Sequence, residues 1–563
     1  MNRYVIGSLW DRNNRNGTNK NFEYLFEGRH KIDELNYRAD GILNEAKKTN
    51  DMNESVQQQI NTLIAESGTS DAEVLQARID AEGNEYAVLK ERLDEKEQNF
   101  SAQLAQIEEQ KVDGQFKSLI VFVPSSYPDI QTAITEVSKL KINSGANIDI
   151  ILESGYMIPE GIFLENGDYS HIRLSSQDDV VSVTDDFTGN FLHAINASLP
   201  IFNILLDMRD KGDYGYSIID NSRGYIMKEK GIINAGGTGL YLRSSFVRAA
   251  WSNFSGANNR SAWFTRGSVG SVAESNLSYC KGGETALYVS RGSTVDASEA
   301  DISHANTTIS AVHCLRSKLS LIDANLSNSN AHGVVALQGS EVALRESDVR
   351  NAKKNAVFAE FSSSVSLSSG TDVSNAGENG LFANKSSKIS GDGVIANNCG
   401  INAALSKGVS EIDCPGIVTD GCRQSGLRAE EGSTINAPNA MISKVVNNGL
   451  LVLSGATINA GGISITECGS HGVSASGVST VNIPNNSISQ NGGYGVTATE
   501  GTRANLRNGS IKSNGQLDIH QTHGATIIAS GCATTQGVNN PIIGDCSVDS
   551  FNTLSSRGIL FGS

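Results

Sequence analysis

Apolar residues return every 23 positions along the C-terminal part of this chain. Three columns share that period: Ile412, Ile435, Ile458, Val481, Ala504 and Ile527; Ile442, Ile465, Ile488 and Ile511; and Leu427, Leu450, Val473, Val496 and Ile519. Three columns with one period are much stronger evidence for a repeated unit than one column would be. Traced backward with slips of one or two residues, the first column reaches Val247, which gives 13 repeats.

The apolar positions of each repeat alternate with polar ones and are separated by Gly, Ser and Asn. This pattern predicts a coil of three short strands, with turn residues such as Asn448 and Gly449 at the corners. One coil cannot bury its own apolar side, so coils must stack in parallel at about 4.8 Å per step. Neither the helical pattern of ankyrin repeats nor an LxxLxL pattern is present. The sequence therefore predicts a mainly β fold, a parallel β-helix.

Residues 28–113 have a different composition and carry heptads. The two core positions are Ile32, Ala39, Ala46, Asn53 and Ile60, and Leu35, Ile42, Thr49, Val56 and Leu63; after a break at 68–70 a second series holds Ala72, Ile79, Tyr86, Leu93, Phe100 and Ile107. A seam of 3.5 residues indicates α-helices that supercoil with copies of themselves. The alternative is a pair of helices folded on each other.

Charge and cysteine content narrow the function classes. The net charge of -16 argues against a general nucleic-acid binder. The N-terminal MNRYVIGSLWDRNN has no apolar run of signal-peptide length, and no segment is apolar enough for a membrane span, which favours a soluble protein assembled in a cytoplasm. Eight cysteines in 563 residues show no metal spacing. We expect reduced thiols, no metal and no cofactor.

Residues 121–164 carry a motif that resembles the opening of pectin-lyase-like proteins. In that superfamily a short helix caps the open end of the barrel before the first coils. The matching residues are Tyr127, Pro128, Ile130, Gln131, Ala133, Ile134, Gly155 and Tyr156. The resemblance implies a right-handed parallel β-helix with a helical cap.

A second resemblance lies in residues 73–95, EVLQARIDAEGNEYAVLKERLDE. This segment is similar to the neck of tail and baseplate proteins of phages that infect Gram-positive bacteria. The matching residues are Glu73, Val74, Ala77, Arg78, Gly83, Tyr86, Leu89, Arg92, Leu93 and Asp94. Together with the cap motif, it identifies the chain as a candidate phage tail spike or tail fibre.

That resemblance implies an order of parts: a virion-attachment segment (1–27), a trimeric coiled-coil neck (28–113), a cap with irregular first coils (114–230), regular coils (231–530) and a C-terminal tip (531–563). It also implies a homotrimer in the virion that joins a tail or baseplate protein through its N-terminus. Such proteins bind, and in some cases cleave, a host surface polysaccharide or teichoic acid. The lyase signature of the superfamily, an Asp-rich calcium site with a catalytic Arg or Lys, cannot be placed on this sequence.

Aromatic residues recur beside the third apolar column, on the side expected to face out of the coil. They are Tyr241, Phe264, Tyr288, His313, Phe358 and Phe382, with Val335 interrupting the series and Trp263 close by. An exposed aromatic stripe about 30 Å long should not be left in water. Two explanations stay open: burial along the threefold axis of a trimer, or a platform on which sugar rings stack.

A carboxylate column follows the first apolar column. Its members are Glu299, Asp323 and Glu346, with Asp301, Asn325 and Asp348 two residues further on. Separations of about 5 and 10 Å between turns bracket those of glycosidase carboxylate pairs. The alternative is a solvated turn. The neighbouring Arg345, Arg350, Lys353 and Lys354 would either neutralise these acids or hold an anionic polymer.

Three hypotheses follow from these features. The first is a tail spike or fibre that binds a cell-wall glycan or teichoic acid during adsorption. The second is a depolymerase that uses the carboxylates by general acid and base catalysis. The third is a structural shaft that carries a separate receptor binder.

Overall fold

The computed structural model describes residues 118–140, 145–535 and 537, and the backbone of residues 111–112, 115–116 and 559–561. The chain divides into two units, Met1–Lys111 and Val112–Ser563, and the fold described below is that of the second unit. The predicted attachment segment, most of the predicted tip and the predicted coiled coil lie outside the described residues. The exception in the coiled coil is β1 (Lys111–Val112), which pairs with β2 (Gln115–Phe116).

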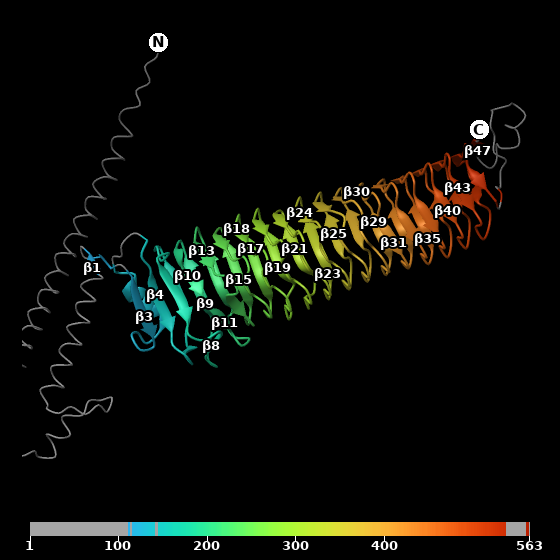
Figure 1. Cartoon of the computed structure of the whole chain (residues 1–563). Helices are drawn as coiled ribbons and strands as arrows, with labels where there is room; N and C mark the ends of the chain where they lie inside the picture. The colour runs from blue at the N-terminus through green and yellow to red at the C-terminus, as the bar shows by residue number, and fades with distance from the viewer. Residues whose placement is uncertain are drawn as a thin grey trace, which may run out of the picture. The chain divides into compact units, whose positions relative to one another are not determined.

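The described residues of this unit form a right-handed parallel β-solenoid of about 17 turns with about 23 residues per turn (Figure 1). The predicted β-helix and its period are therefore confirmed. Within residues 114–230, expected to hold a cap and irregular first coils, the strands from Leu119 to Ile226 already belong to the same sheets. Each turn runs through sheet 3, then sheet 1, then sheet 2, named after the apolar column that each contains.

Sheet 1 contains the first apolar column, and all its pairings are parallel. Its strands are β3 Leu119–Val123, β4 Ile148–Leu152, β7 Ile172–Ser176, β10 Ser198–Asn203, β13 Arg223–Ile226, β16 Phe246–Arg248, β18 Val269–Ser271, β20 Thr294–Asp296, β22 Lys318–Ser320, β24 Glu341–Leu344, β26 Ser364–Leu367, β28 Lys388–Ser390, β30 Glu411–Asp413, β33 Thr434–Asn436, β36 Thr457–Asn459, β39 Thr480–Asn482, β42 Arg503–Asn505, β45 Thr526–Ile528 and β47 Ile559–Phe561.

Sheet 2 contains the second apolar column. Its strands are β5 Met157–Ile158, β8 Val181–Val183, β11 Leu205–Asp207 and β14 Gly231–Ile233, then β31 Val418–Asp420, β34 Met441–Ser443, β37 Ser464–Thr466, β40 Ser487–Ser489, β43 Ser510–Lys512 and β46 Ala533–Thr534. Single-residue bridges connect the two groups: Asn253, Asn276, Asp301, Asn325, Asp348, Asp372 and Ile395. Sheet 2 is thus narrowest where polar side chains occupy the bridging position.

Sheet 3 contains the third apolar column. Its strands are β6 Ile162–Glu165, β9 Asn190–Ile195, β12 Tyr214–Ile219, β15 Thr238–Arg243, β17 Arg260–Thr265, β19 Thr285–Ser290, β21 Ser310–Leu315, β23 His332–Leu337, β25 Val357–Glu360, β27 Leu381–Asn384, β29 Asn402–Ser406, β32 Ser425–Ala429, β35 Asn448–Val452, β38 Val473–Ala475, β41 Val496–Ala498 and β44 Ile519–Gln521. These are the longest strands of most turns, so sheet 3 presents the broadest outer face.

The apolar columns form one continuous core inside the turns. Ile412, Ile435 and Ile458 pair in register and are fully buried, with polar neighbours on either side in each strand. This alternation gives a period of two, as required for strands with one buried face. Cys399, Cys422 and Cys468 are buried in the same core. Their burial indicates that they act as small apolar core residues.

The corners between sheets use left-handed backbone. In most turns each corner contains one or two residues with positive φ, as at Arg291, Glu299 and His304, where φ is 56°, 58° and 55°. Asn and Gly tolerate this region best, which explains why the repeats are rich in both. The corner side chains point away from the core and are therefore free to differ from turn to turn.

The single described helix, α4 (Ile130–Val137), lies within the predicted cap motif. Asp129 caps it by accepting a hydrogen bond from the Thr132 backbone N–H at 2.7 Å. Ile130, Ala133 and Ile134 are buried against β3, β4 and β6. The helix expected from the motif is confirmed. No helix in the described part of the chain is long and apolar enough to cross a membrane.

Candidate functional site

The outer face of sheet 3 carries a row of aromatic side chains. We call it the aromatic ladder; its members are Tyr241, Trp263, Tyr288, His313, Phe358 and Phe382. The first four pair in register on successive turns, and Phe358 pairs with Phe382. Val335, which is almost fully buried, separates the two groups. All six ladder residues are half-buried, so the row is open to solvent along one side.

The rings of the ladder contact one another along the solenoid. Ring centres are 4.7 Å apart between Tyr241 and Trp263, 5.9 Å between Trp263 and Tyr288, and 5.1 Å between Tyr288 and His313. Phe358 and Phe382 stack at 5.0 Å. The interplanar angle of 51° between Tyr241 and Trp263 leaves part of each face uncovered. Such rings stabilise the sheet and still offer apolar surface to a ligand.

Phe264, which the sequence placed in this row, is a core residue. It is fully buried and pairs with Leu242 and Val289, which point inward. The turn between Tyr241 and its true partner Trp263 has 22 residues, one fewer than the period. A shift of one residue moves a side chain to the opposite face of a strand. Trp263 therefore takes the position assigned to Phe264.

A buried arginine supports the middle of the ladder. The Arg260 guanidinium lies 4.8 Å from the Trp263 ring centre and 5.5 Å from that of Tyr288. It forms an ion pair of 2.8 Å with Glu284, whose side chain is largely exposed. The sequence analysis did not identify Arg260 and Glu284 as functional residues. Their separation of 24 residues, about one turn, was the signal that could have found them.

The same region contains polar groups without protein partners. Within the described residues, the buried Trp263 Nε1–H and Arg260 Nε–H have no hydrogen-bond acceptor. Buried donors in native proteins nearly always have a partner, which can be water or a ligand. Burial lowers the pKa of His313 to about 4, although the Glu284 charge opposes this effect. The imidazole is therefore neutral at pH 7 and can both donate and accept a hydrogen bond.

Glu299, Asp323 and Glu346 lie at the corner between sheets 1 and 2. All three side chains are exposed, and the residues lie on successive turns. The backbone at each is left-handed, with φ of 58°, 56° and 59°. The structure thus brings them into one column, as the sequence predicted. Their role in catalysis stays a prediction.

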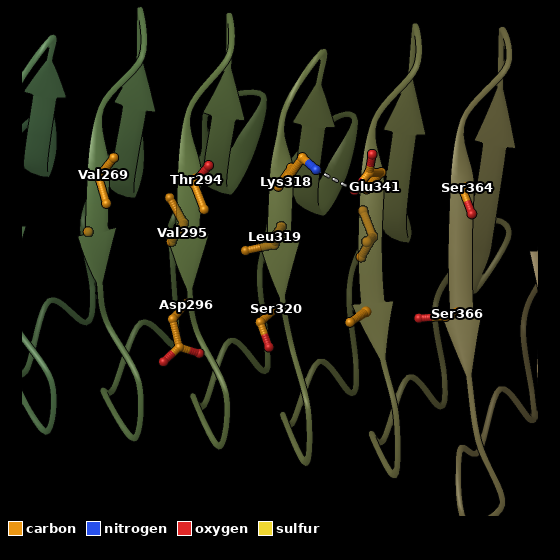
Figure 2. A pocket seen from close by; sticks show the side chains of 13 residues that line it. Val269, Thr294, Val295, Asp296, Lys318, Leu319, Ser320, Glu341, Ser364 and Ser366 are labelled. Carbon is orange, nitrogen blue, oxygen red and sulfur yellow. Dashed lines mark ion pairs between the residues drawn. The ribbon is translucent and has the colours of Figure 1, made fainter.

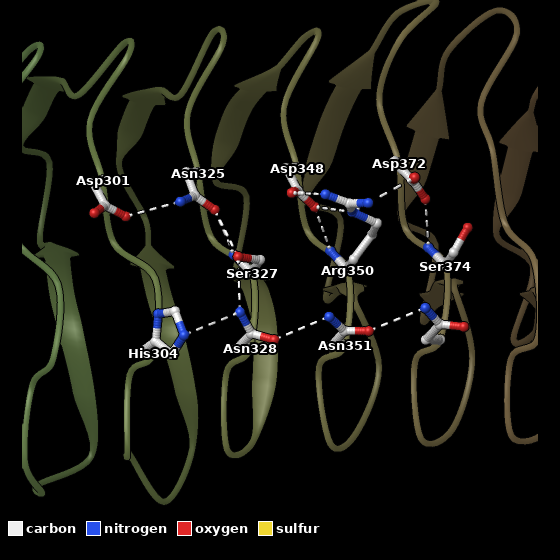
Figure 3. Close-up of polar contacts among 11 residues, drawn as sticks. Asp301, His304, Asn325, Ser327, Asn328, Asp348, Arg350, Asn351, Asp372 and Ser374 are labelled. Carbon is white, nitrogen blue, oxygen red and sulfur yellow. Dashed lines mark hydrogen bonds and ion pairs between the residues drawn. The ribbon is translucent and has the colours of Figure 1, made fainter.

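Asp301 and Asp348 belong to a different column, the bridges of sheet 2. The Asp301 carboxylate accepts hydrogen bonds from the Ser303 backbone N–H at 3.1 Å and from the Asn325 amide at 3.0 Å. Asp348 accepts two from the Arg350 guanidinium, at 2.9 and 2.7 Å (Figure 3). Burial would raise the pKa of Asp348, but its hydrogen bonds and the Arg350 charge outweigh burial and lower it. These contacts fit a structural role and disfavour Asp348 as a general acid.

The predicted anionic-ligand patch is divided along one loop. Arg345 directly follows β24, whereas Lys353 and Lys354 lie just before β25. Arg350, between them, is bound to Asp348 and lies 3.8 Å from Asp372. Its charge is therefore already compensated within the loop.

A shallow groove of about 600 Å³ lies on the outer face of sheet 1 (Figure 2). Strands β18, β20, β22, β24 and β26 form its floor. Lys318 and Glu341 face each other across neighbouring strands in an ion pair of 2.8 Å. The groove holds Thr294, Asp296 and Ser320 as further polar groups. Among the described residues, no group of three or more His, Cys, Asp or Glu side chains could hold a metal ion.

Comparisons with known proteins give distant structural likenesses. No protein-family model matches the chain, and no curated protein matches it in sequence. A periplasmic alginate epimerase, AlgG, is similar at 10% identity over 74% of this chain and 85% of its own, with a TM-score of 0.30. The catalytic unit of a GH87 alpha-1,3-glucanase from Streptomyces thermodiastaticus strain HF3-3 has 11% identity, coverage of 57% and 63%, and a TM-score of 0.25.

The Dettilon tailspike protein has 12% identity, covers 79% of this chain and 68% of its own, and gives a TM-score of 0.21. Identities and TM-scores in this range support no functional argument.

Proposed function

We propose that this chain is a phage tail spike or fibre whose aromatic ladder binds a host cell-wall glycan or teichoic acid during adsorption. The observation that carries the proposal is the row of half-buried rings on sheet 3, supported by Arg260. Sugar rings have apolar faces that pack on aromatic side chains, and their hydroxyls need donors and acceptors beside those faces. Trp263, Tyr288 and His313 supply both kinds of group.

A trimer interface is the competing use of the same surface. The centres of obligate interfaces are apolar and depleted in charged residues. The ladder has the Arg260–Glu284 ion pair and His313 at its middle. That polar content favours an occupant rich in hydroxyl groups over a second β-sheet.

The setting of the protein follows from the neck resemblance in residues 73–95. We propose a homotrimer held by the neck (28–113), joined to the phage tail through residues 1–27, and present in the virion. The solenoid would then be the part of the protein that contacts the glycan.

A depolymerase is the second candidate. The observation that favours it is the column of exposed carboxylates at Glu299, Asp323 and Glu346. Carboxylates about 5 Å apart on neighbouring turns have the separation used by retaining glycosidases.

The proposal is tested by measuring how tightly the protein binds purified cell wall. We expect the double variant Trp263→Ser/Tyr288→Ser to lose most binding to purified cell wall while its molar mass by light scattering is unchanged. Phe246→Ser is the matched control, because Phe246 is an exposed aromatic residue on sheet 1. Unchanged binding in the double variant, or dissociation of the assembly, would refute the glycan role of the ladder.

A further inference from the structure

Three arginines form a second ladder at the corner between sheets 3 and 1. Arg266, Arg291 and Arg316 occupy equivalent positions on successive turns: the Gly267 N–H donates to the Arg291 carbonyl, and the Gly292 N–H donates to the Arg316 carbonyl. Each has left-handed backbone, with φ of 56°, 56° and 51°. All three side chains are exposed. We call this set the arginine ladder.

The fold does not require arginine at this position. Equivalent corner positions on other turns hold Ser244, Gln338, Phe361, Lys385, Gly408, Glu431 and Ser454, and the single lysine among them is paired with Glu360. The left-handed backbone is shared by these positions, but like charges about 4.8 Å apart on neighbouring turns repel each other. Three successive arginines therefore work against stability, and their presence calls for a different explanation, such as a ligand.

The arginine ladder has no acidic partner in the described part of the solenoid, where no ion pair involves any of its three side chains. The acids that border it are engaged elsewhere. Asp220 binds Arg243 at 2.5 Å, Glu284 binds Arg260, and Glu341 binds Lys318. The Asp296 carboxylate accepts hydrogen bonds from the Ser298 hydroxyl and backbone N–H. Three positive charges thus remain uncompensated on a chain with a net charge of -16.

The position of the arginine ladder connects the other two surface features. Arg266, Arg291 and Arg316 each follow a member of the aromatic ladder by three residues, since Trp263, Tyr288 and His313 precede them. The strands that follow, β18, β20 and β22, form the floor of the groove on sheet 1. The charge of Arg266 reaches Tyr241, where it and Arg243 oppose the rise in pKa that burial causes.

We propose that the arginine ladder binds the negative groups of an acidic glycan that lies along the solenoid. This inference rests on the proposed function and specifies the ligand class as a polymer with repeated carboxylates or phosphates. Guanidinium groups bind both anions through paired hydrogen bonds. Stacked turns repeat the guanidinium about every 4.8 Å, so successive charges of an extended polymer can each meet one.

Another copy of the chain is the competing occupant. Its acidic corner, with Glu299, Asp323 and Glu346, has the same rise per turn and the opposite charge. The position of the arginine ladder next to the aromatic ladder and the groove favours a glycan, because one polymer could contact all three. An effect on the oligomeric state would support the other occupant instead.

The test uses the full chain and three polymers: alginate with carboxylates, poly(glycerol phosphate) lipoteichoic acid with phosphates, and neutral dextran. The variant is Arg266→Gln/Arg291→Gln/Arg316→Gln, because Gln338 shows that glutamine fits this position. The matched control is Arg423→Gln/Arg503→Gln/Arg507→Gln, which removes the same charge from exposed arginines on other turns. We expect about tenfold weaker binding of an acidic polymer in the first variant at low salt, from three exposed charge pairs.

The loss should vanish at high salt, and the control should stay within about twofold of the unaltered chain. A loss with only one of the two acidic polymers supports the inference and identifies the anion. The inference is overturned if the unaltered chain, the Arg266→Gln/Arg291→Gln/Arg316→Gln variant and the control bind both acidic polymers equally. A fall in the molar mass of the Arg266→Gln/Arg291→Gln/Arg316→Gln variant overturns it as well. If cell-wall binding depends on Trp263 and Tyr288 but not on the arginines, the proposed function stands and this inference fails.

Discussion

The Arg260 guanidinium lies 4.8 Å from the centre of the Trp263 ring on the outer face of sheet 3. Both residues lie on β17, three positions apart, and Tyr288 from the next turn completes the contact at 5.5 Å. The exposed Glu284 forms an ion pair of 2.8 Å with the same guanidinium. A residue that is nine-tenths buried thus connects two turns of the solenoid and fixes the orientation of the rings proposed to contact sugar.

Arg260→Ala should destabilise the solenoid. The change removes a partly desolvated cation–π contact and the packing of the long side chain, which together should lower the free energy of unfolding by about 1–3 kcal/mol. Glu284→Gln is the matched control, since its largely exposed ion pair should contribute under about 1 kcal/mol. Thermal unfolding of both variants measures the difference, and equal melting temperatures for the two would contradict the structural role of Arg260.

Stability should fall between about pH 6.5 and pH 4. Burial lowers the pKa of both His313 and His332 to about 4, with the Lys354 charge adding to the effect at His332. In this window the unfolded chain binds protons that the folded chain does not, so stability rises with pH. Each histidine contributes on the order of 1 kcal/mol per pH unit.

The measurement is the melting temperature as a function of pH. We expect His313→Gln to reduce the slope between pH 4 and 6.5, and the exposed His523→Gln to leave it unchanged. A slope that His313→Gln does not alter would show that the imidazole is accessible to protons in the folded chain.

The strict part of the repeat could be predicted because its period is constant. Ile435 and Ile458 pair in register exactly one period apart, and both are buried as expected. The assignment failed at Phe264, where a turn lost one residue and the inward and outward positions exchanged. Alternation in strands fixes the faces only as long as the length of each turn is known.

The carboxylate columns show a second limit of sequence reasoning. A column of Asp residues has the same spacing whether it holds a substrate or a backbone turn. The difference lies in the residue two positions further on: Ser303 and Ser327 donate their backbone N–H groups to Asp301 and Asn325. The recurrence of Asp or Asn followed two residues later by Ser was a signal for such turns. The Arg260 contact, in contrast, joins two turns through side chains and leaves no local pattern.

Asp348 should stabilise its loop through local hydrogen bonds rather than through its charge. Asp348→Asn keeps an oxygen for the Arg350 backbone N–H, 3.0 Å away in the native chain, and should cost under about 1 kcal/mol. Asp348→Ala removes that acceptor and should cost about 1–3 kcal/mol. Thermal unfolding distinguishes the two variants. Equal losses would mean that the ion pair, and not the turn, is what stabilises this loop.

The exposed carboxylates allow a direct test of the depolymerase. If the chain only binds glycan, cell wall incubated with it should release no more reducing ends or phosphate than with Glu299→Gln/Asp323→Asn/Glu346→Gln. This is the expected outcome, because within the described residues no ion pair or hydrogen bond orients these three side chains, and catalytic groups need such support. Release by the native chain that the triple variant abolishes would instead establish the second candidate. Asp348→Asn separates the two columns, since it should leave any such release unchanged if the corner carboxylates perform the chemistry.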